Sequence, residues 1–162
     1  MNWDDYFMTM VYLVASKSKD ERTHIGTVII GPKKEIRSTG YNGFVRGLND
    51  AVSKRQEKIE KQFWFEHAER NAIYNATLMG ISLLDCTMYT QGVPCMDCAR
   101  GIVQSGIKEV VVDKEWDINK IFAERNRRTL EMFEETGVNL RYHKPEYIKI
   151  VKMNDGITYP LE

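Results

Sequence analysis

The 162-residue sequence has few cysteines and no excess of charge of either sign. Its three cysteines are too few for a disulfide framework, so reduced thiols, metal ligation or catalysis are favoured. Lys plus Arg and Asp plus Glu both number 23, which argues against a protein that coats nucleic acid, because phosphate-backbone affinity needs uncompensated cations. This balance still permits a local basic pocket for one small anion.

Long hydrophobic runs and linkers are also lacking. Apolar runs such as 28–30 and 110–112 are short, whereas a membrane helix needs about 20 apolar residues. Asp4 and Asp5 stand where a signal peptide would carry Lys or Arg, so we expect a cytoplasmic protein. No stretch rich in Pro, Gly or Ser divides the chain. We therefore expect a single domain, 1–162, with its core at about 10–142 and a C-terminal extension at 143–162.

Hydrophobic periodicity and turn residues predict alternating helices and strands. The predicted helices are 3–14, 67–79, 95–105 and 119–136, and the predicted strands are 27–30, 35–40, 86–90, 108–112 and 138–142. The glycine-rich stretch 40–50 predicts a long loop, and the tail predicts an extension or a hairpin at 154–156. From residue 67 onward this order favours parallel strands with helices on both faces, while the first two strands form a hairpin. We therefore expect an α/β fold with three layers, α/β/α, around a mixed sheet of about five strands.

Two short motifs carry side chains suited to metal chemistry: His67-Ala68-Glu69 and Pro94-Cys95-Met96-Asp97-Cys98. Zn²⁺ takes imidazole nitrogen and thiolate sulfur in tetrahedral geometry. Cys95 and Cys98 lie three residues apart at a predicted helix start, so both can face one point, where the helix N-terminus favours thiolates. With His67 as third ligand, one position stays open for water, as in catalytic zinc sites. Glu69 can then move a proton from that water to a leaving group, which suits hydrolytic loss of ammonia from an amidine-like carbon.

Other interpretations of these residues are available. Cys95 and Cys98 could form a redox pair, but the His-x-Glu motif would then be unexplained. A structural zinc would need a fourth ligand from the remaining His and Cys residues, which are Cys86, His24 and His143. We expect Cys86 to be a small core residue, since free cysteine is often buried, and the two histidines to be surface or hydrogen-bonded side chains.

The combination H-x-E and P-C-x-x-C is the signature of zinc nucleobase deaminases, and the sequence resembles the cytidine and deoxycytidylate deaminase superfamily. The stretches that are similar to deoxycytidylate (dCMP) deaminases in particular are SKD at 18–20, GYNG at 40–43, HAERNA at 67–72 and QSGIKEVVV at 104–112. The resemblance covers about 10–142. It implies a cytidine-deaminase-like fold and hydrolysis of dCMP to dUMP and ammonia, which feeds thymidylate synthesis. It also implies a homo-oligomer, often a hexamer, activated by dCTP and inhibited by dTTP.

Residue by residue, the resemblance assigns one zinc per chain to His67, Cys95 and Cys98, and the proton shuttle to Glu69. The substrate contacts that it implies are Asn42, Ala68 and Trp116, with Lys19 and Arg22 as candidates for the 5′-phosphate beside Lys17 and Arg46. The candidates for a loop that binds a regulatory nucleotide, with Mg²⁺, are Tyr41, Gly43, Arg46 and Asn49. Asn42 could instead be a turn asparagine, Trp116 a core or interface residue, and each cation a solvated surface charge.

Two rival functions stay open. One is a deaminase of the same fold that acts on another nucleoside, nucleotide or nucleobase. The other is a catalytically silent nucleotide-binding module that keeps zinc for structure. The balanced charge favours a free-nucleotide substrate, and we expect no nucleic acid polymer or membrane as partner. The amphipathic pattern of 119–136 fits either a helix that covers the sheet or an oligomer interface.

Overall fold

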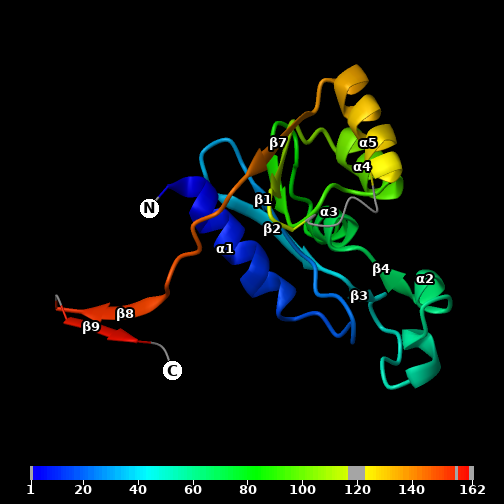
Figure 1. Ribbon diagram of the computed structural model, residues 1–162, viewed down its shortest axis with the longest axis horizontal. Coiled ribbons are helices and arrows are strands. Elements are labelled where there is room, and N and C mark those ends of the chain that lie inside the picture. The colour runs from blue at the N-terminus through cyan, green and yellow to red at the C-terminus, as the bar shows by residue number, and fades with distance from the viewer. Residues whose placement is uncertain (1, 117–122, 156, 161–162) are drawn as a thin grey trace.

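The computed structural model describes residues 2–116, 123–155 and 157–160, and its centre is a five-stranded mixed sheet (Figure 1). The sheet order is β2-β1-β5-β6-β7, with β1 at Gly26–Ile30, β2 at Ile36–Tyr41, β5 at Thr87–Thr90, β6 at Glu109–Asp113 and β7 at Asn139–His143. β1 is antiparallel to β2 and β5, whereas β5, β6 and β7 are parallel. The predicted mixed sheet and its opening hairpin are confirmed.

Helices cover both faces of this sheet, which confirms the three predicted layers (Figure 1). One face carries α1 (Trp3–Ala15), and the other carries α3 (Ala68–Leu78), α4 (Met96–Gln104) and α5 (Ala123–Thr136). Every residue of β1 is buried because apolar layers meet it from both sides. Val28 and Ile30 pack with Phe7 of α1, while Ile29 packs with the cluster under α3 and α4. Residues 119–122 of the predicted helix 119–136 lie outside the described residues.

Smaller elements lie where the sequence predicted a loop or no regular structure. They are β3 (Gly43–Phe44), η1 (Ser53–Gln56), α2 (Lys61–Trp64) and β4 (Phe65–Glu66). β3 pairs with β4, so the loop that follows β2 is joined to the residues that precede α3. Two-residue strands have no hydrophobic periodicity of their own, which is why sequence patterns did not find them. At the other end of the chain, β8 (Val151–Asn154) and β9 (Ile157–Pro160) form the predicted hairpin, which projects from the body (Figure 1).

Close backbone contact fixes the start of α3 over the end of β2. A Cβ atom on Gly40 would lie 2.3 Å from the backbone nitrogen of Ala72 and 2.4 Å from the carbonyl oxygen of Ala68. Only glycine permits this approach. The first turn of α3 therefore has a fixed place beside the sheet edge.

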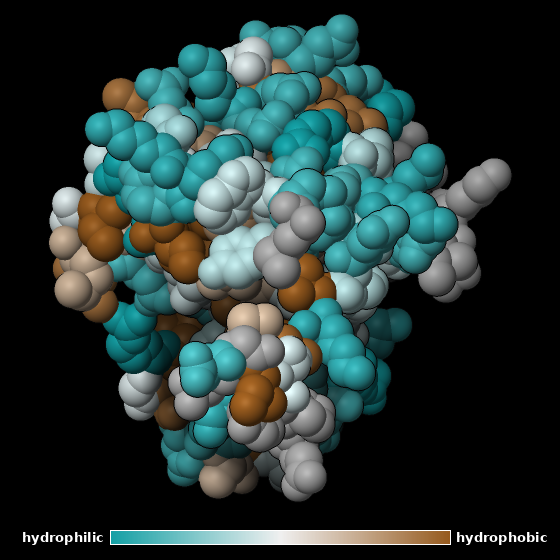
Figure 2. All heavy atoms as spheres, turned by 90° about the vertical axis from the view of Figure 1, so that its left-hand side faces the viewer, coloured by the Kyte–Doolittle hydropathy of each residue, from teal (hydrophilic) through white to brown (hydrophobic). Residues whose placement is uncertain are grey.

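The outer surface mixes polar and apolar residues. On the face seen in Figure 2, hydrophobic residues lie in several separate small patches among hydrophilic ones. Among the described residues, no helix combines the length and the apolar character needed to cross a membrane.

Candidate active site

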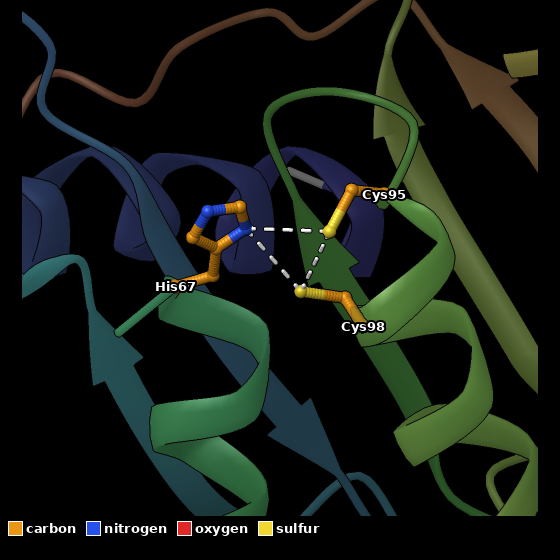
Figure 3. A group of neighbouring side chains, drawn as sticks. All are labelled: His67, Cys95 and Cys98. Atoms are coloured by element: carbon orange, nitrogen blue, oxygen red, sulfur yellow. Dashed lines mark hydrogen bonds between the residues drawn. The ribbon is translucent and has the colours of Figure 1, made fainter. Parts of the chain in front are cut away.

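The two predicted ligand motifs meet where α3 and α4 begin (Figure 3). His67 is the N-cap of α3 and Cys95 is the N-cap of α4, both with extended backbone. Cys98 lies in the first turn of α4. Because both helices begin here, their positive dipole ends favour negative charge on the two sulfurs. The sequence prediction that His67, Cys95 and Cys98 come together is confirmed.

The spacing of the three ligand atoms suits a tetrahedral metal ion. Nδ1 of His67 lies 3.4 Å from Sγ of Cys95 and 3.5 Å from Sγ of Cys98, and the two sulfurs are 3.5 Å apart. Tetrahedral Zn²⁺ with ordinary bond lengths would separate nitrogen from sulfur by about 3.6 Å and sulfur from sulfur by about 3.8 Å. An imidazole and two thiols are also the donor types that zinc takes. The residues present therefore fit this ion.

Electrostatics at the cluster separate the two thiols: they favour the anionic form of Cys95, whereas the hydrogen bond to Cys95 and burial raise the pKa of Cys98. The hydrogen bond between Cys95 and Cys98, followed by the contact with His67, lowers the pKa of Cys95 to about 3 despite partial burial. This lowered pKa favours the thiolate form of Cys95. A thiolate, not a thiol, is the form that binds metal.

Glu69 is a buried carboxyl group in the first turn of α3. Glu69 is 7% exposed, and burial raises the pKa of its carboxyl group above the ordinary value. A carboxyl group whose pKa lies nearer to neutral can both accept and return a proton. Glu69 therefore lies beside the metal-ligand cluster and at the wall of the pocket that is described next.

A pocket of about 670 Å³ opens beside the cluster. Its lining includes His67, Ala68, Glu69 and Cys95 on one side and Asn42 and Trp116 elsewhere. The acidic and basic residues of its wall, beyond these, are Asp20, Glu66 and Asp97 together with Lys61 and Arg70. Six predicted site residues, the first metal motif among them, therefore lie around one cavity.

Asn42 and Trp116 line the pocket in different ways. The Asn42 side chain is buried, donates to the carbonyl of Thr23 at 2.8 Å and to Asp20 at 3.1 Å, and accepts from the amide of Ile25 at 2.8 Å. Its oxygen can accept one further hydrogen bond. Trp116 is 39% exposed, and its indole Cδ1 lies 3.0 Å from the point where a Cβ on Gly92 would stand. The indole therefore lies close over the backbone of the loop after β5.

The predicted phosphate candidates lie outside the pocket lining. Lys19 is exposed and forms an ion pair with Asp50, and Arg22 and Lys17 are exposed. Arg46 donates to Oδ1 of Asn75 at 2.6 Å on the outer side of α3. The cations that do line the pocket are Lys61 and Arg70.

Sequence patterns missed both of these cations. Arg70 follows Glu69 directly and is three residues from His67, so its helical position could have placed it at the site. Lys61 belongs to α2, a four-residue helix whose sequence gave no periodic signal. The sequence pattern also indicated no role for Asp20, the acidic residue of the SKD stretch, which accepts hydrogen bonds from both Lys61 and Asn42.

The residues suggested for a regulatory nucleotide lie along one exposed loop. Tyr41 is 42% exposed, and its carbonyl accepts a hydrogen bond from Asn71 at 2.8 Å. Gly43 opens the short strand β3, while Arg46 and Asn49 are exposed. Asn49 accepts from the amide of Ala51 and, through its carbonyl, from Arg55. The loop begins at the pocket, because Asn42 lines the pocket, and then leads away from it.

Comparison with known proteins gives consistent matches. Residues 1–114 match the family model of the cytidine and deoxycytidylate deaminase zinc-binding region. Deoxycytidylate deaminases of Mus musculus and Homo sapiens are each 34% identical over 164 aligned residues, covering 97% of this chain and 88% of each relative. The fold is similar to the crystal structure of dCMP deaminase from the cyanophage S-TIM5, with a TM-score of 0.67 and 20% identity. That likeness covers 86% of this chain and 96% of the phage chain.

Proposed function

The chain belongs to the cytidine and deoxycytidylate deaminase family, and from that premise we propose that it hydrolyses dCMP to dUMP and ammonia. One observation carries the proposal. His67, Cys95 and Cys98 form a zinc-type ligand set beside a pocket whose lining includes His67, Cys95 and the buried carboxyl of Glu69. The substrate is suggested by relatives named deoxycytidylate deaminase that match nearly the whole chain.

We assign one zinc ion per chain to His67, Cys95 and Cys98. When bound, zinc supplies the Lewis-acid chemistry that makes water nucleophilic at neutral pH. The chain contributes an imidazole and two sulfurs held at the start of two helices, which leaves one side of the cluster facing the pocket. A purely structural zinc would use a fourth protein ligand instead.

Glu69 moves the protons of the reaction in this proposal. Hydrolysis forms a bond from a water oxygen to C4 of cytosine and breaks the bond from C4 to the exocyclic nitrogen. Glu69 accepts a proton from the attacking water and places it on ring N3, and it then carries the second water proton to that nitrogen, which leaves as ammonia as the C4 carbonyl forms. Burial of Glu69 keeps bulk water away from this proton and supports its transfer within the pocket.

The remaining substrate contacts are assigned from the residues that line the pocket. We assign to Trp116 the aromatic surface against the pyrimidine, to Asn42 a hydrogen bond to the nucleoside, and to Ala68 the wall beside the metal ligands. Lys19 and Arg22 would have to reach in from outside the lining to bind the 5′-phosphate. Lys61 and Arg70 already face the cavity, so they are the more direct candidates.

A panel of substrates tests the proposed function. The zinc-loaded protein is incubated with dCMP, CMP, deoxycytidine and guanine, and ammonia release is measured for each. We expect turnover of dCMP and a lower kcat/KM for deoxycytidine, because the phosphate is part of what the site recognises. Preferred turnover of another base would support the rival deaminase, and no turnover of any of them would support the silent module.

We further propose nucleotide regulation and self-assembly. The exposed loop that contains Tyr41, Gly43, Arg46 and Asn49 begins at the pocket, so a nucleotide bound there could alter the position of Asn42. dCTP would activate and dTTP would inhibit, each with Mg²⁺, and the chains would form a homo-oligomer such as a hexamer. Assays with each effector, and light scattering during size-exclusion chromatography, test these two points.

A further inference from the structure

A buried carboxylate at the end of β6 accepts hydrogen bonds from three segments of the chain. Asp113 is 2% exposed. Its Oδ2 accepts hydrogen bonds from the Tyr12 hydroxyl at 2.5 Å and from the Tyr147 hydroxyl at 2.6 Å. Its Oδ1 accepts the amide N–H of Glu115 at 2.8 Å. A single side chain therefore joins α1, the segment after β7 and the turn after β6.

That turn carries the pocket residue Trp116. The amide of Trp116 donates to the carbonyl of Asp113 at 3.3 Å. The ring centroids of Trp116 and Tyr12 are 6.2 Å apart, and the ring of Tyr147 meets that of Tyr12 edge-on at 5.1 Å. Three aromatic rings thus form a row from the pocket to the C-terminal segment. The hydrogen bonds from the Tyr12 and Tyr147 hydroxyls to the carboxylate of Asp113 connect these two rings to the turn.

The two phenols are fixed donors in this arrangement. Burial and the hydrogen bond to Asp113 raise the pKa of Tyr147 to about 12, and the same two causes raise the pKa of Tyr12 further. Both hydroxyl groups keep their protons at any pH at which the enzyme would work. The carboxylate of Asp113 consequently has a constant set of three donors.

We propose that Tyr147 and Tyr12 are positioning residues for the substrate site, which hold the 113–116 turn through Asp113 and so set the angle of the Trp116 indole. The proposal rests on the proposed function, since it takes Trp116 as the surface against the pyrimidine. It extends the substrate site to the C-terminal segment, whose described residues contribute nothing to the pocket lining.

Other contacts anchor the same segment without Tyr147. The amide of Glu146 donates to Oδ1 of Asp5 at 3.0 Å, and the amide of Ile148 donates to the Thr9 hydroxyl at 3.0 Å. His143 lies 2.8 Å from the same Asp5 oxygen. Removing only the Tyr147 hydroxyl should therefore leave the segment docked on α1. The ring row also stays, because phenylalanine keeps the edge-on contact.

The test isolates Trp116 as a fluorescent reporter. The chain has three tryptophans, so Trp3→Phe and Trp64→Phe leave Trp116 alone. In that background, Tyr147→Phe is compared with Tyr74→Phe, which alters a half-exposed tyrosine on α3. The measurements are Trp116 anisotropy and emission, zinc content, melting temperature, and kcat and KM for dCMP.

We expect Tyr147→Phe to lower the Trp116 anisotropy and to raise KM roughly 3- to 10-fold, with kcat changed less than about 2-fold. Zinc content should stay at the parent value, and Tyr74→Phe should match the parent protein throughout. Tyr12→Phe should change anisotropy and KM in the same direction. A role in stability alone would lower the melting temperature without moving KM.

Two results would overturn the proposal. One is an unchanged Trp116 anisotropy and KM in Tyr147→Phe. The other is a normal KM in Trp116→Ala, because the indole would then have no part in substrate binding. If the parent protein does not turn over dCMP, the proposed function fails, and the anisotropy comparison still decides whether Tyr147 orders Trp116.

Discussion

The ammonium group of Lys61 lies 2.5 Å from Oδ2 of Asp20 at the wall of the pocket. Asp20 is 2% exposed and also accepts hydrogen bonds from Asn42 and from the amides of Arg22 and Thr23. Burial alone would raise the pKa of Asp20, but the hydrogen bonds from Lys61 and the two amides together lower it. Lys61 is thus held in place with two of its three N–H donors available for a ligand.

Lys61→Met should therefore weaken recognition of the phosphate. We expect kcat/KM for dCMP to fall roughly 10- to 100-fold while that for deoxycytidine stays within about 2-fold, because a charge-assisted hydrogen bond is lost from one substrate only. Lys19→Met is the matched control, since Lys19 also pairs with an aspartate but lies outside the lining. If Lys19→Met gave the larger loss, the phosphate contact would belong to Lys19, as the sequence suggested.

Loss of one metal ligand should remove the zinc. In Cys98→Ser we expect zinc affinity to fall by more than about 100-fold and activity to vanish, because a thiolate is replaced by a poor ligand. Elemental analysis after dialysis measures this. Cys86→Ala is the control, since Cys86 is buried in the core cluster under α3 and should keep one zinc per chain. Full zinc content in Cys98→Ser would disprove the assignment.

A clash at Gly40 should disturb both stability and the site. Gly40→Ala places a methyl group against backbone atoms of α3, so we expect the free energy of unfolding to fall by about 2–3 kcal/mol. The same displacement moves the first turn of α3, which carries Glu69. Gly43→Ala is the control, because the nearest atom to its new Cβ would be a Tyr41 ring carbon at 4.0 Å. Urea unfolding compares the two, and equal stabilities would contradict the close approach.

Asp4 should make the stability depend on acid pH. Hydrogen bonds from Arg141, and then from Tyr89, lower its pKa below the ordinary 3.8 against the effect of burial. Folded Asp4 therefore binds a proton less tightly than in the unfolded chain. The stabilisation that ionised Asp4 gives the folded state is complete above about pH 3.8 and is lost as the pH falls through the folded pKa.

The matching experiment compares Asp4→Asn with the parent protein in denaturant between pH 6 and pH 3. We expect a loss of about 1–2 kcal/mol at pH 6 that shrinks toward pH 3, because protonation removes the same interaction from the parent. Asp85→Asn, which breaks an exposed pair with Lys108, should cost less than about 1 kcal/mol. A loss at Asp4 that does not change with pH would contradict this account.

The sequence was most informative where function depends on local spacing. Cys95 precedes a helix and Cys98 lies in its first turn, so motif spacing placed these two sulfurs at one point, and His67 joins them from the start of another helix. The hairpin, the parallel strands and the layers followed from hydrophobic periods of two and 3.6 residues. These features are encoded by residues close together in the chain.

Contacts between distant residues could not be predicted in this way. Lys61 reaches Asp20 across 41 positions, and Tyr147 reaches Asp113 across 34. Lys61 lines the pocket and Lys19 does not. The residues next to each lysine in the sequence did not predict this difference. The short pairing of β3 with β4 sets this difference, because it brings the segment that holds Lys61 toward the site.

The most direct measurement of the central claim is the stoichiometry of product formation from dCMP. Zinc-loaded protein should release dUMP and ammonia in a ratio of one to one. Glu69→Gln should bind the same amount of zinc but lose at least about 100-fold in rate, because the proton carrier is gone. Glu135→Gln, an exposed position on α5, should behave like the parent. A zinc-loaded protein that leaves dCMP unchanged, or a fully active Glu69→Gln, would contradict the account.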